Sequence, residues 1–204
     1  MPVVTVSREL GSLGTRIAEE AGARLGAPCV DKEVLAEMAR QAGVPVNEIV
    51  ESEEKLLSRP MVVSEEMRAF FSRRGESGVL TAENYVERMS AAIRALAEQG
   101  DAVFVGRGAQ LILAGEPRVL HVHIFASPEI RAKRIQERRG LTDEQAALQI
   151  VRQADERRRT WFRRFFTGAN WKDPRYYDLM INTGRISAQT AVELIVAAAL
   201  SEPE

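Results

Sequence analysis

A glycine-bearing turn near the start of the chain has the composition of an anion site. Residues 3–7 form a short β-branched run, and residues 11–16 (Gly-Ser-Leu-Gly-Thr-Arg) join it to an amphipathic helical pattern. Such a turn leaves free backbone N–H groups and a helix N-terminus at the edge of a sheet, and both attract phosphate. The turn lacks the lysine of the Walker A pattern G-x-x-x-x-G-K-[ST]. The sequence therefore predicts a phosphate site here, although the turn alone does not identify the ligand.

A dense group of basic side chains is the second feature that suits phosphate. The net charge of the whole chain is only −1, which argues against bulk nucleic-acid binding. Arginine grips two phosphate oxygens with its planar fork and stays charged. We therefore expect these side chains to bind a small polyanion. We also expect the segment that carries them to be a mobile lid that becomes ordered when the ligand binds. The members of the basic group are Arg131, Lys133, Arg134, Arg138, Arg139, Arg152, Arg157, Arg158, Arg159, Arg163 and Arg164.

One helical pattern within this region carries two charges on its apolar face. Asp155 and Arg158 fall on the same line as Val151, Phe162 and Phe165, at spacings of three and four residues. An unpaired charge would be costly to bury there. Two interpretations stay open: the two side chains form an ion pair along the helix, or they face a polar ligand cavity.

The elements that must position these residues alternate along the chain. Helical patterns separate short apolar runs, and continuous β-branched runs between helices are typical of a parallel sheet covered on both faces. The length of 204 residues fits a single domain, residues 1–204, in which 58–80 is the least regular part and is predicted to be flexible or inserted. The predicted strands are residues 3–7, 28–30, 102–106, 119–125 and 178–182.

Composition and apolar patterning predict a cytoplasmic protein. Cys29 is the only cysteine, so no internal disulfide can form. The sequence shows no signal-peptide pattern and no apolar run of the roughly 20 residues needed to span a bilayer, so no membrane partner is expected.

Two other groups of residues favour alternatives that we consider weaker. His121 and His123 share a strand face, but no third ligand is near in sequence, so no zinc site is expected. Residues 161–166 and Trp171 mix aromatic and basic side chains as single-strand binders do. Their helical spacing favours a lid hinge or a surface for a homo-oligomer, and a nucleic-acid partner is not expected.

Several segments, in order, give the chain a likeness to a known family. It resembles the cytidylate-kinase-like proteins of the P-loop nucleoside monophosphate kinase group. Each segment is weak alone, but together they follow successive predicted strands. They are Ser7-Arg8-Glu9-Leu10-Gly11-Ser12, Val30-Asp31-Lys32-Glu33, Val105-Gly106-Arg107-Gly108, Ser127-Pro128-Glu129-Ile130-Arg131, Asp155-x-x-Arg158 and Tyr177-Asp178-Leu179-Met180-Ile181-Asn182-Thr183.

The resemblance implies a fold and a reaction. The fold would be the α/β three-layer P-loop NTPase fold, with a five-stranded parallel sheet between helices and an arginine-rich helical lid over residues 131–175. The reaction would be transfer of the γ-phosphoryl group of ATP, with Mg²⁺, to a small acceptor, a nucleoside monophosphate such as CMP. The partners would be ATP and that acceptor.

The resemblance also implies roles for the donor side of the site. Arg131, Arg134 and Arg158 would be catalytic, with the first two flanking the donor phosphates when the lid closes. Thr15 and Glu9 would lie on the metal side. The donor phosphates would be bound by Gly11, Ser12, Leu13, Gly14, Thr15 and Arg16.

On the acceptor side, the resemblance implies binding by Asp31, Arg107, Asp155 and Arg158. Simpler interpretations remain open for two of them. Asp31 has the residue type and place of a helix N-cap, and Arg107 could form an ordinary surface ion pair.

The chain departs from ordinary nucleotide kinases at residue 14, from the cytidylate-kinase-like pattern Gly-Ser-Gly-Gly at residue 13, and from cytidylate kinase proper at residue 108. Gly14 stands where other nucleotide kinases have the P-loop lysine, and Arg8, Arg16 or the lid arginines are the candidates to replace its charge. Leu13 replaces a glycine, and because leucine disfavours positive φ the loop is expected to be strained. Gly108 replaces an aspartate that organises metal. These departures keep a second hypothesis open, a nucleotide-binding regulatory protein of the same fold with weak or no kinase activity.

Overall fold

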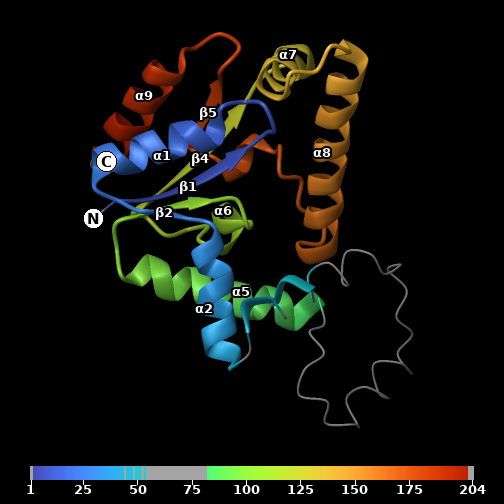
Figure 1. Ribbon diagram of the computed structural model, residues 1–204. Coiled ribbons are helices and arrows are strands. Elements are labelled where there is room, and N and C mark those ends of the chain that lie inside the picture. Colours follow the sequence, from blue (N-terminus) through green and yellow to red (C-terminus); the bar gives the residue numbers. More distant parts are fainter. Residues whose placement is uncertain (1, 44, 48, 52, 54–81, 202–204) are drawn as a thin grey trace.

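The computed structural model describes residues 2–43, 45–47, 49–51, 53 and 82–201. The irregular segment expected at 58–80 lies outside these residues. The described chain forms one sheet with helices on both of its faces (Figure 1). None of the described helices is long and apolar enough to cross a membrane.

The sheet has five parallel strands in the order β2-β3-β1-β4-β5. This confirms the predicted fold class, and each strand begins and ends within one residue of its predicted bounds. The chain runs from β1 to the β2 edge, returns to β3 and then crosses to β4, so the carboxyl end of β1 is a topological switch point where ligands bind. The strands are β1 (Val3–Arg8), β2 (Cys29–Val30), β3 (Ala102–Val105), β4 (Val119–Phe125) and β5 (Leu179–Asn182).

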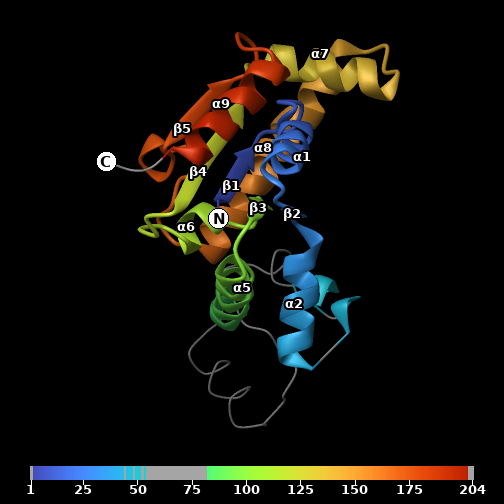
Figure 2. The same cartoon turned by 90° about the vertical axis from the view of Figure 1, so that its left-hand side faces the viewer.

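The helices form the two outer layers. On one face α1 packs against α9, and beside the other face α2 packs against α5 (Figure 2). Helix α8 stands beside the carboxyl ends of the strands (Figure 1). The helical elements are α1 (Gly14–Leu25), α2 (Lys32–Ala42), α5 (Ala82–Glu98), α6 (Ala109–Ile112), α7 (Pro128–Arg139), α8 (Glu144–Phe165), the 3₁₀ turn η1 (Pro174–Tyr176) and α9 (Ala188–Leu200).

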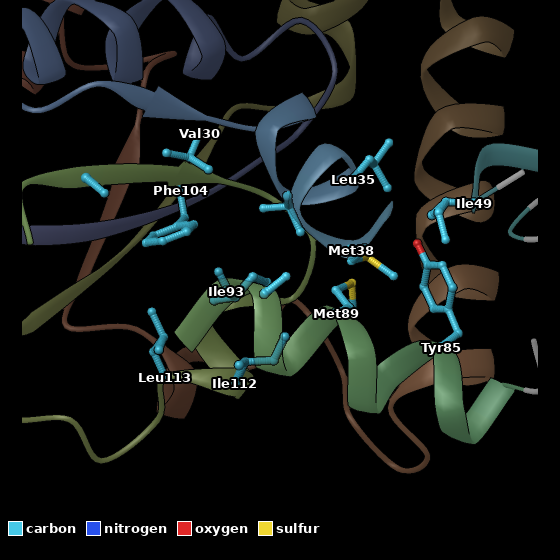
Figure 3. Packing of buried hydrophobic residues seen from close by; sticks show 14 of the residues in the cluster. Val30, Leu35, Met38, Ile49, Tyr85, Met89, Ile93, Phe104, Ile112 and Leu113 are labelled. Carbon is cyan, nitrogen blue, oxygen red and sulfur yellow. The ribbon is translucent and has the colours of Figure 1, made fainter. Parts of the chain in front are cut away.

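Alternate residues of the central strand point into two separate cores. Val4 and Val6 pack under α1 and α9, whereas Val3 belongs to the core that α2, α5 and α6 complete. In this second core Phe104 lies above Ile93 of α5 (Figure 3). The alternation follows from the period of two in a β-strand, which gives each face of the sheet its own core.

Helices α7 and α8 form a hairpin that is attached to the rest of the molecule at both ends. A small apolar cluster that includes Ile135 and Val151 joins the two helices. At the far end of α8, Phe165 is buried in the core under α5, with its ring 4.7 Å from that of Tyr85. The hairpin is the region predicted to act as a lid.

Candidate functional site

The turn between β1 and α1 has the backbone of an anion-binding loop. Gly11 has a φ of 82° and Leu13 a φ of 66°, so leucine takes the left-handed conformation that it disfavours. The strain expected at this position is therefore present. The N–H groups from Gly14 to Arg16 have no partner within the helix, as at every helix N-terminus. The hydroxyl of Ser12 is buried and has no hydrogen-bond partner among the described residues.

Two of the predicted site arginines hold this loop from outside. Arg134 donates from Nη1 to the carbonyl oxygen of Gly11 at 3.2 Å and from Nη2 to that of Thr183 at 2.7 Å. The Arg131 guanidinium donates to the carbonyl oxygens of Leu10 and Ala126. In this structure both side chains therefore bind loop and strand carbonyls, and their contact with donor phosphates stays a prediction.

Arg131 also lies at the centre of a buried ion cluster with Glu9, Asp155 and Lys172. Its side chain is 1% exposed, with Nε 3.1 Å from the Glu9 carboxylate and Nη2 2.9 Å from that of Asp155. The Lys172 ammonium lies 2.5 Å from the other Glu9 oxygen and 3.6 Å from Asp155. Although burial by itself raises the pKa of Asp155, Arg131 and Lys172 lower it overall. Asp155 thus pairs with these two cations, and the structure does not show the Asp155–Arg158 pair considered above.

Arg158 lies over the ring of Trp171, with its guanidinium carbon 5.1 Å from the ring centre. In the part of the chain that the structure describes, it makes no ion pair or hydrogen bond. Burial, reinforced by the nearby Arg8 guanidinium, lowers the pKa of Arg158 to about 10. Asp155 and Glu9 lie near enough to favour its charge without forming an ion pair with it, and the face of an aromatic ring offsets part of the cost of burial.

A second charged group gathers at the carboxyl ends of β1, β2 and β3. Asp31 lies 3.6 Å from the Arg8 guanidinium and 3.7 Å from that of Arg107. Asp31 does occupy the N-cap position of α2, but its side chain makes no capping hydrogen bond. Its carboxylate faces the two arginines instead, which favours the site over the simple cap.

Arg107 occupies the turn after β3 with a φ of 57°, a conformation that non-glycine residues rarely adopt. Its Nη1 donates to both carboxylate oxygens of Glu53, at 2.9 and 2.8 Å. Burial opposes the charge, but Glu53, Tyr85 and Asp31 together raise the pKa of Arg107. The strained backbone and the half-buried ion pairs mark Arg107 as more than a surface ion pair.

Sequence reasoning missed two charged residues of this site. Glu53 lies in an acidic run, Glu51-Ser52-Glu53-Glu54, in which nothing distinguishes it from its neighbours. The structure joins it to Arg107 and to the indole Nε1 of Trp161 at 2.8 Å. Lys172 lies after the predicted lid helix and belongs to no charge pattern. Both are brought in by tertiary contacts between segments that are far apart in sequence.

The replacement of the family's aspartate by Gly108 has a steric reason. Gly108 has a φ of 69°, and a Cβ at this position would lie 2.5 Å from the ring of Phe166. An aspartate therefore does not fit while the end of α8 packs here. On α1, the Arg16 side chain pairs with Glu20 at 2.9 Å and lies along the helix surface.

The histidines and the aromatic segment are interior groups. His121 hydrogen-bonds to Thr5, with 2.8 Å between His121 Nδ1 and Thr5 Oγ1. His123 is 1% exposed, and burial, with Lys172 and Arg158 nearby, lowers its pKa to about 4. Phe162, Phe165 and Trp171 are also buried, so they present no exposed stacking surface. The described residues contain no group of three or more side chains arranged to hold a metal ion.

Comparison with known proteins agrees with this geometry. The model of the cytidylate kinase-like family matches residues 3–185. The chain belongs to the cytidylate kinase-like family. The match spans all five strands and both helices of the α7–α8 hairpin, and it confirms the resemblance seen in the sequence segments.

Individual relatives of this cytidylate kinase-like chain are distant. A cytidylate kinase from Pyrobaculum arsenaticum is 28% identical over 96% of the chain and 91% of the relative. One from Methanopyrus kandleri is 30% identical over 52% of the chain, which spans 58% of that relative's length. In fold, an uncharacterized protein from Eubacterium ventriosum matches with a TM-score of 0.68 and 24% identity, covering 98% of this chain and 99% of the other.

Proposed function

We propose that this protein transfers the γ-phosphoryl group of ATP to a nucleoside monophosphate such as CMP. The family supports a nucleotide or small-molecule kinase in general. The observation that carries the proposal is the meeting of the glycine loop with Arg8, Arg107 and Arg158 at the switch point of the sheet. Phosphoryl transfer needs positioning and charge neutralisation more than covalent chemistry, and this arrangement supplies both.

On the donor side, the loop would receive the ATP phosphates. Backbone N–H groups from Gly14 to Arg16 point from the start of α1, where the helix dipole favours anions. The buried Ser12 hydroxyl lacks a partner and fits a phosphate oxygen as its acceptor. We assign Arg131 and Arg134 the role of positioning residues, because they fix the carbonyl oxygens on the other side of this loop.

The residues present fit Mg²⁺ that is held mainly by the nucleotide. Protein-bound Mg²⁺ commonly keeps several waters and uses one or two side chains together with substrate phosphates. Thr15 is exposed on the first turn of α1 and offers a hydroxyl there. Both Glu9 oxygens are engaged by cations, so we assign Glu9 to the ion cluster and not to the metal. When bound, the ion would neutralise phosphate charge.

On the acceptor side, Arg107 and Arg158 would bind the monophosphate and its sugar. Both guanidiniums are shielded from water, which strengthens their bonds to an anion. Asp31 would orient the acceptor, since its carboxylate is 44% exposed between Arg8 and Arg107. Asp155 would act by holding Arg131 and Lys172 in place.

The second hypothesis is a nucleotide-binding regulator with weak or no transfer. Two features favour this regulator. Gly14 replaces the lysine, and the Phe166 ring occupies the space that an aspartate side chain at residue 108 would need. The retention of Arg107 and Arg158 in the same site favours the kinase.

The test is ATP turnover with a panel of acceptors, followed by ³¹P NMR. The panel holds the common nucleoside monophosphates and several non-nucleotide alcohols, each with and without Mg²⁺. We expect formation of ADP and a nucleoside diphosphate that depends on the acceptor and on Mg²⁺. Binding of ADP without transfer to any acceptor would support the regulator instead, and transfer only to an alcohol would overturn the choice of a monophosphate.

A further inference from the structure

Two positions of the loop are exchanged relative to the Walker A pattern. In G-x-x-x-x-G-K-[ST] the lysine follows the first glycine by six residues. With Thr15 at the hydroxyl position, this chain has Gly14 at the place of the lysine and Arg8 at the place of that first glycine. A cation and a glycine have therefore changed places between the end of β1 and the start of α1.

The structure gives this exchange a steric cause. A Cβ at residue 14 would lie 2.4 Å from the Cβ of Arg8 and 3.1 Å from its Cγ. These atoms are the stem of Arg8, next to its backbone, and cannot swing away as a side-chain tip does. Residue 14 begins α1 and does not have a positive φ, so backbone conformation does not demand glycine there. Gly14 is needed because Arg8 fills the space in which a lysine side chain would begin.

The head of Arg8 lies over the centre of the site. Its Nη1 is 2.3 Å from the place of a Cβ at Gly106, at the carboxyl end of β3, and its Nη2 is 3.6 Å from Asp31. The side chain is 22% exposed. The side chain thus extends from the proposed donor loop toward the proposed acceptor side, along the path that a transferred phosphoryl group would take.

Four other cations near the loop are engaged elsewhere, and Arg158 lies over the ring of Trp171. Arg16 pairs with Glu20 on the surface of α1, and Lys172 pairs with Glu9. Arg131 and Arg134 bind loop carbonyls. Within the residues that the structure describes, Arg8 makes one ion pair, with Asp31 at 3.6 Å.

We infer that Arg8 supplies, from the strand side of the loop, the cation that a Walker A lysine supplies from the helix side, and that Arg8 and Gly14 form one interdependent unit. The inference rests on the proposed function. Arg8 would contact the β-phosphate, which ADP retains, and the phosphoryl group in transfer, while Asp31 holds the other edge of the guanidinium. Arginine suits this place because its planar guanidinium binds two phosphate oxygens at once.

The steric half is tested without any ligand. Alanine is normally better than glycine at a helical position. We expect Gly14→Ala nevertheless to lower Tm by several degrees, and to lower it much less when Arg8→Gly is also present. An equal loss in both backgrounds would overturn the claim that the Arg8 stem dictates Gly14.

The functional part of the inference is tested by variants that remove the cation from residue 8 and place one at residue 14. Arg8→Gly should reduce phosphoryl transfer and ADP affinity at least tenfold, and Gly14→Lys should do the same because it collides with Arg8. The double variant Arg8→Gly/Gly14→Lys should recover at least tenfold over either single variant. Arg185→Gly, at an exposed position after β5, is the control and should match the parent.

ADP affinity, measured by calorimetry, separates this inference from the proposed function. If the parent binds ADP without transferring phosphate, the kinase proposal fails, and loss and recovery of ADP affinity still support Arg8. If Arg8→Gly keeps the ADP affinity and the transfer rate of the parent, the role of Arg8 is overturned but the kinase proposal is not. A folded double variant no better than the single variants would do the same, and a parent that neither binds ADP nor transfers phosphate overturns both proposals.

Discussion

The loop that we propose binds the donor and the charged group that we propose binds the acceptor are held in different ways. Arg131, which is 1% exposed, and Arg134 tie the loop through backbone carbonyls and buried carboxylates. On the acceptor side Asp31 and Glu53 hold Arg107 only through side chains, and Asp31 is 44% exposed. A hydrogen bond from an arginine to a backbone carbonyl persists when a substrate binds. An arginine that pairs with a carboxylate can instead exchange that partner for a phosphate. The difference indicates a preformed donor loop and an acceptor side whose ion pairs rearrange.

The largest effect is expected from Arg131→Met. The change leaves Glu9 and Asp155 with Lys172 as their remaining cation in the buried cluster, and breaking a buried ion pair costs about 3–5 kcal/mol. Urea denaturation should show this loss of unfolding free energy, while Lys133→Met, exposed on the same helix, should change it little. A small loss for Arg131→Met would contradict the rigid donor side.

Next in size is a pH dependence of stability from His123, a buried residue of β4 near Arg131 and Lys172. Its pKa is about 4 in the folded chain against 6.5 when unfolded, so the unfolded chain binds the proton more readily. The free energy of unfolding is therefore unaffected by His123 above pH 6.5. As the pH drops from 6.5 toward 4, protonation of the unfolded chain lowers it by on the order of 3 kcal/mol.

The measurement compares the parent with His123→Phe, which keeps an aromatic ring among Phe125, Trp171 and Tyr177. Unfolding free energy measured between pH 7 and pH 4 should fall less in the variant than in the parent. Parallel curves would show that His123 is not the titrating group.

Arg158→Ala and Arg107→Ala should impair use of the acceptor more than binding of ATP. The loss of a charge-assisted bond should cost roughly 2 kcal/mol, more than tenfold in kcat/KM for the acceptor. Arg157→Ala, at the exposed neighbouring position of α8, is the control for Arg158. Transfer as fast as in the parent by both variants would remove them from the acceptor site.

The smallest effect is expected from Glu53→Gln. This change frees Arg107 from a carboxylate that competes with phosphate, so KM for the monophosphate should fall severalfold, about 1 kcal/mol, with a slightly lower Tm. Glu87→Gln, exposed on α5, should leave KM unchanged. A higher KM for Glu53→Gln would mean that Glu53 positions Arg107 for the acceptor, and the acceptor side would then be as preformed as the loop.

The lid remains a prediction that bears on the same comparison. The α7–α8 hairpin is joined to the donor loop through Arg131 and to the α5 core through Phe165. If it nevertheless orders on binding, hydrogen exchange over residues 131–164 should slow when donor and acceptor analogues are both present. Unchanged exchange with both bound would contradict a mobile lid.

Much of the fold could be predicted from the sequence because its signals are local. Residues 119–125 were predicted as a strand from an apolar run with turn residues on both sides, and β4 has the same bounds. Strain at Leu13 was expected because leucine replaces a glycine of the family pattern there, and its φ of 66° agrees. The alternation of strands and helices predicted a parallel sheet covered on both faces, whereas the strand order that creates the switch point came only from the structure.

The partners of the site side chains could not be predicted in this way. Asp155 was expected to pair with Arg158 or to face a ligand cavity, but it pairs with Arg131, 24 residues away, and with Lys172. Glu53 reaches Arg107 across 54 residues and Trp161 across 108. Such contacts depend on how helices pack over the sheet, and no local periodicity records them.

The sequence by itself determined the order of strands and helices along the chain, the glycine-bearing turn at residues 11–16 and the family, since backbone propensity and motif spacing are properties of neighbouring residues. Only the tertiary structure decided which charges neutralise one another. Electrostatic and steric interactions fall off with distance in space, not in sequence. For the same reason, the absence of a lysine at residue 14 becomes intelligible only when the Arg8 stem is seen to occupy its place.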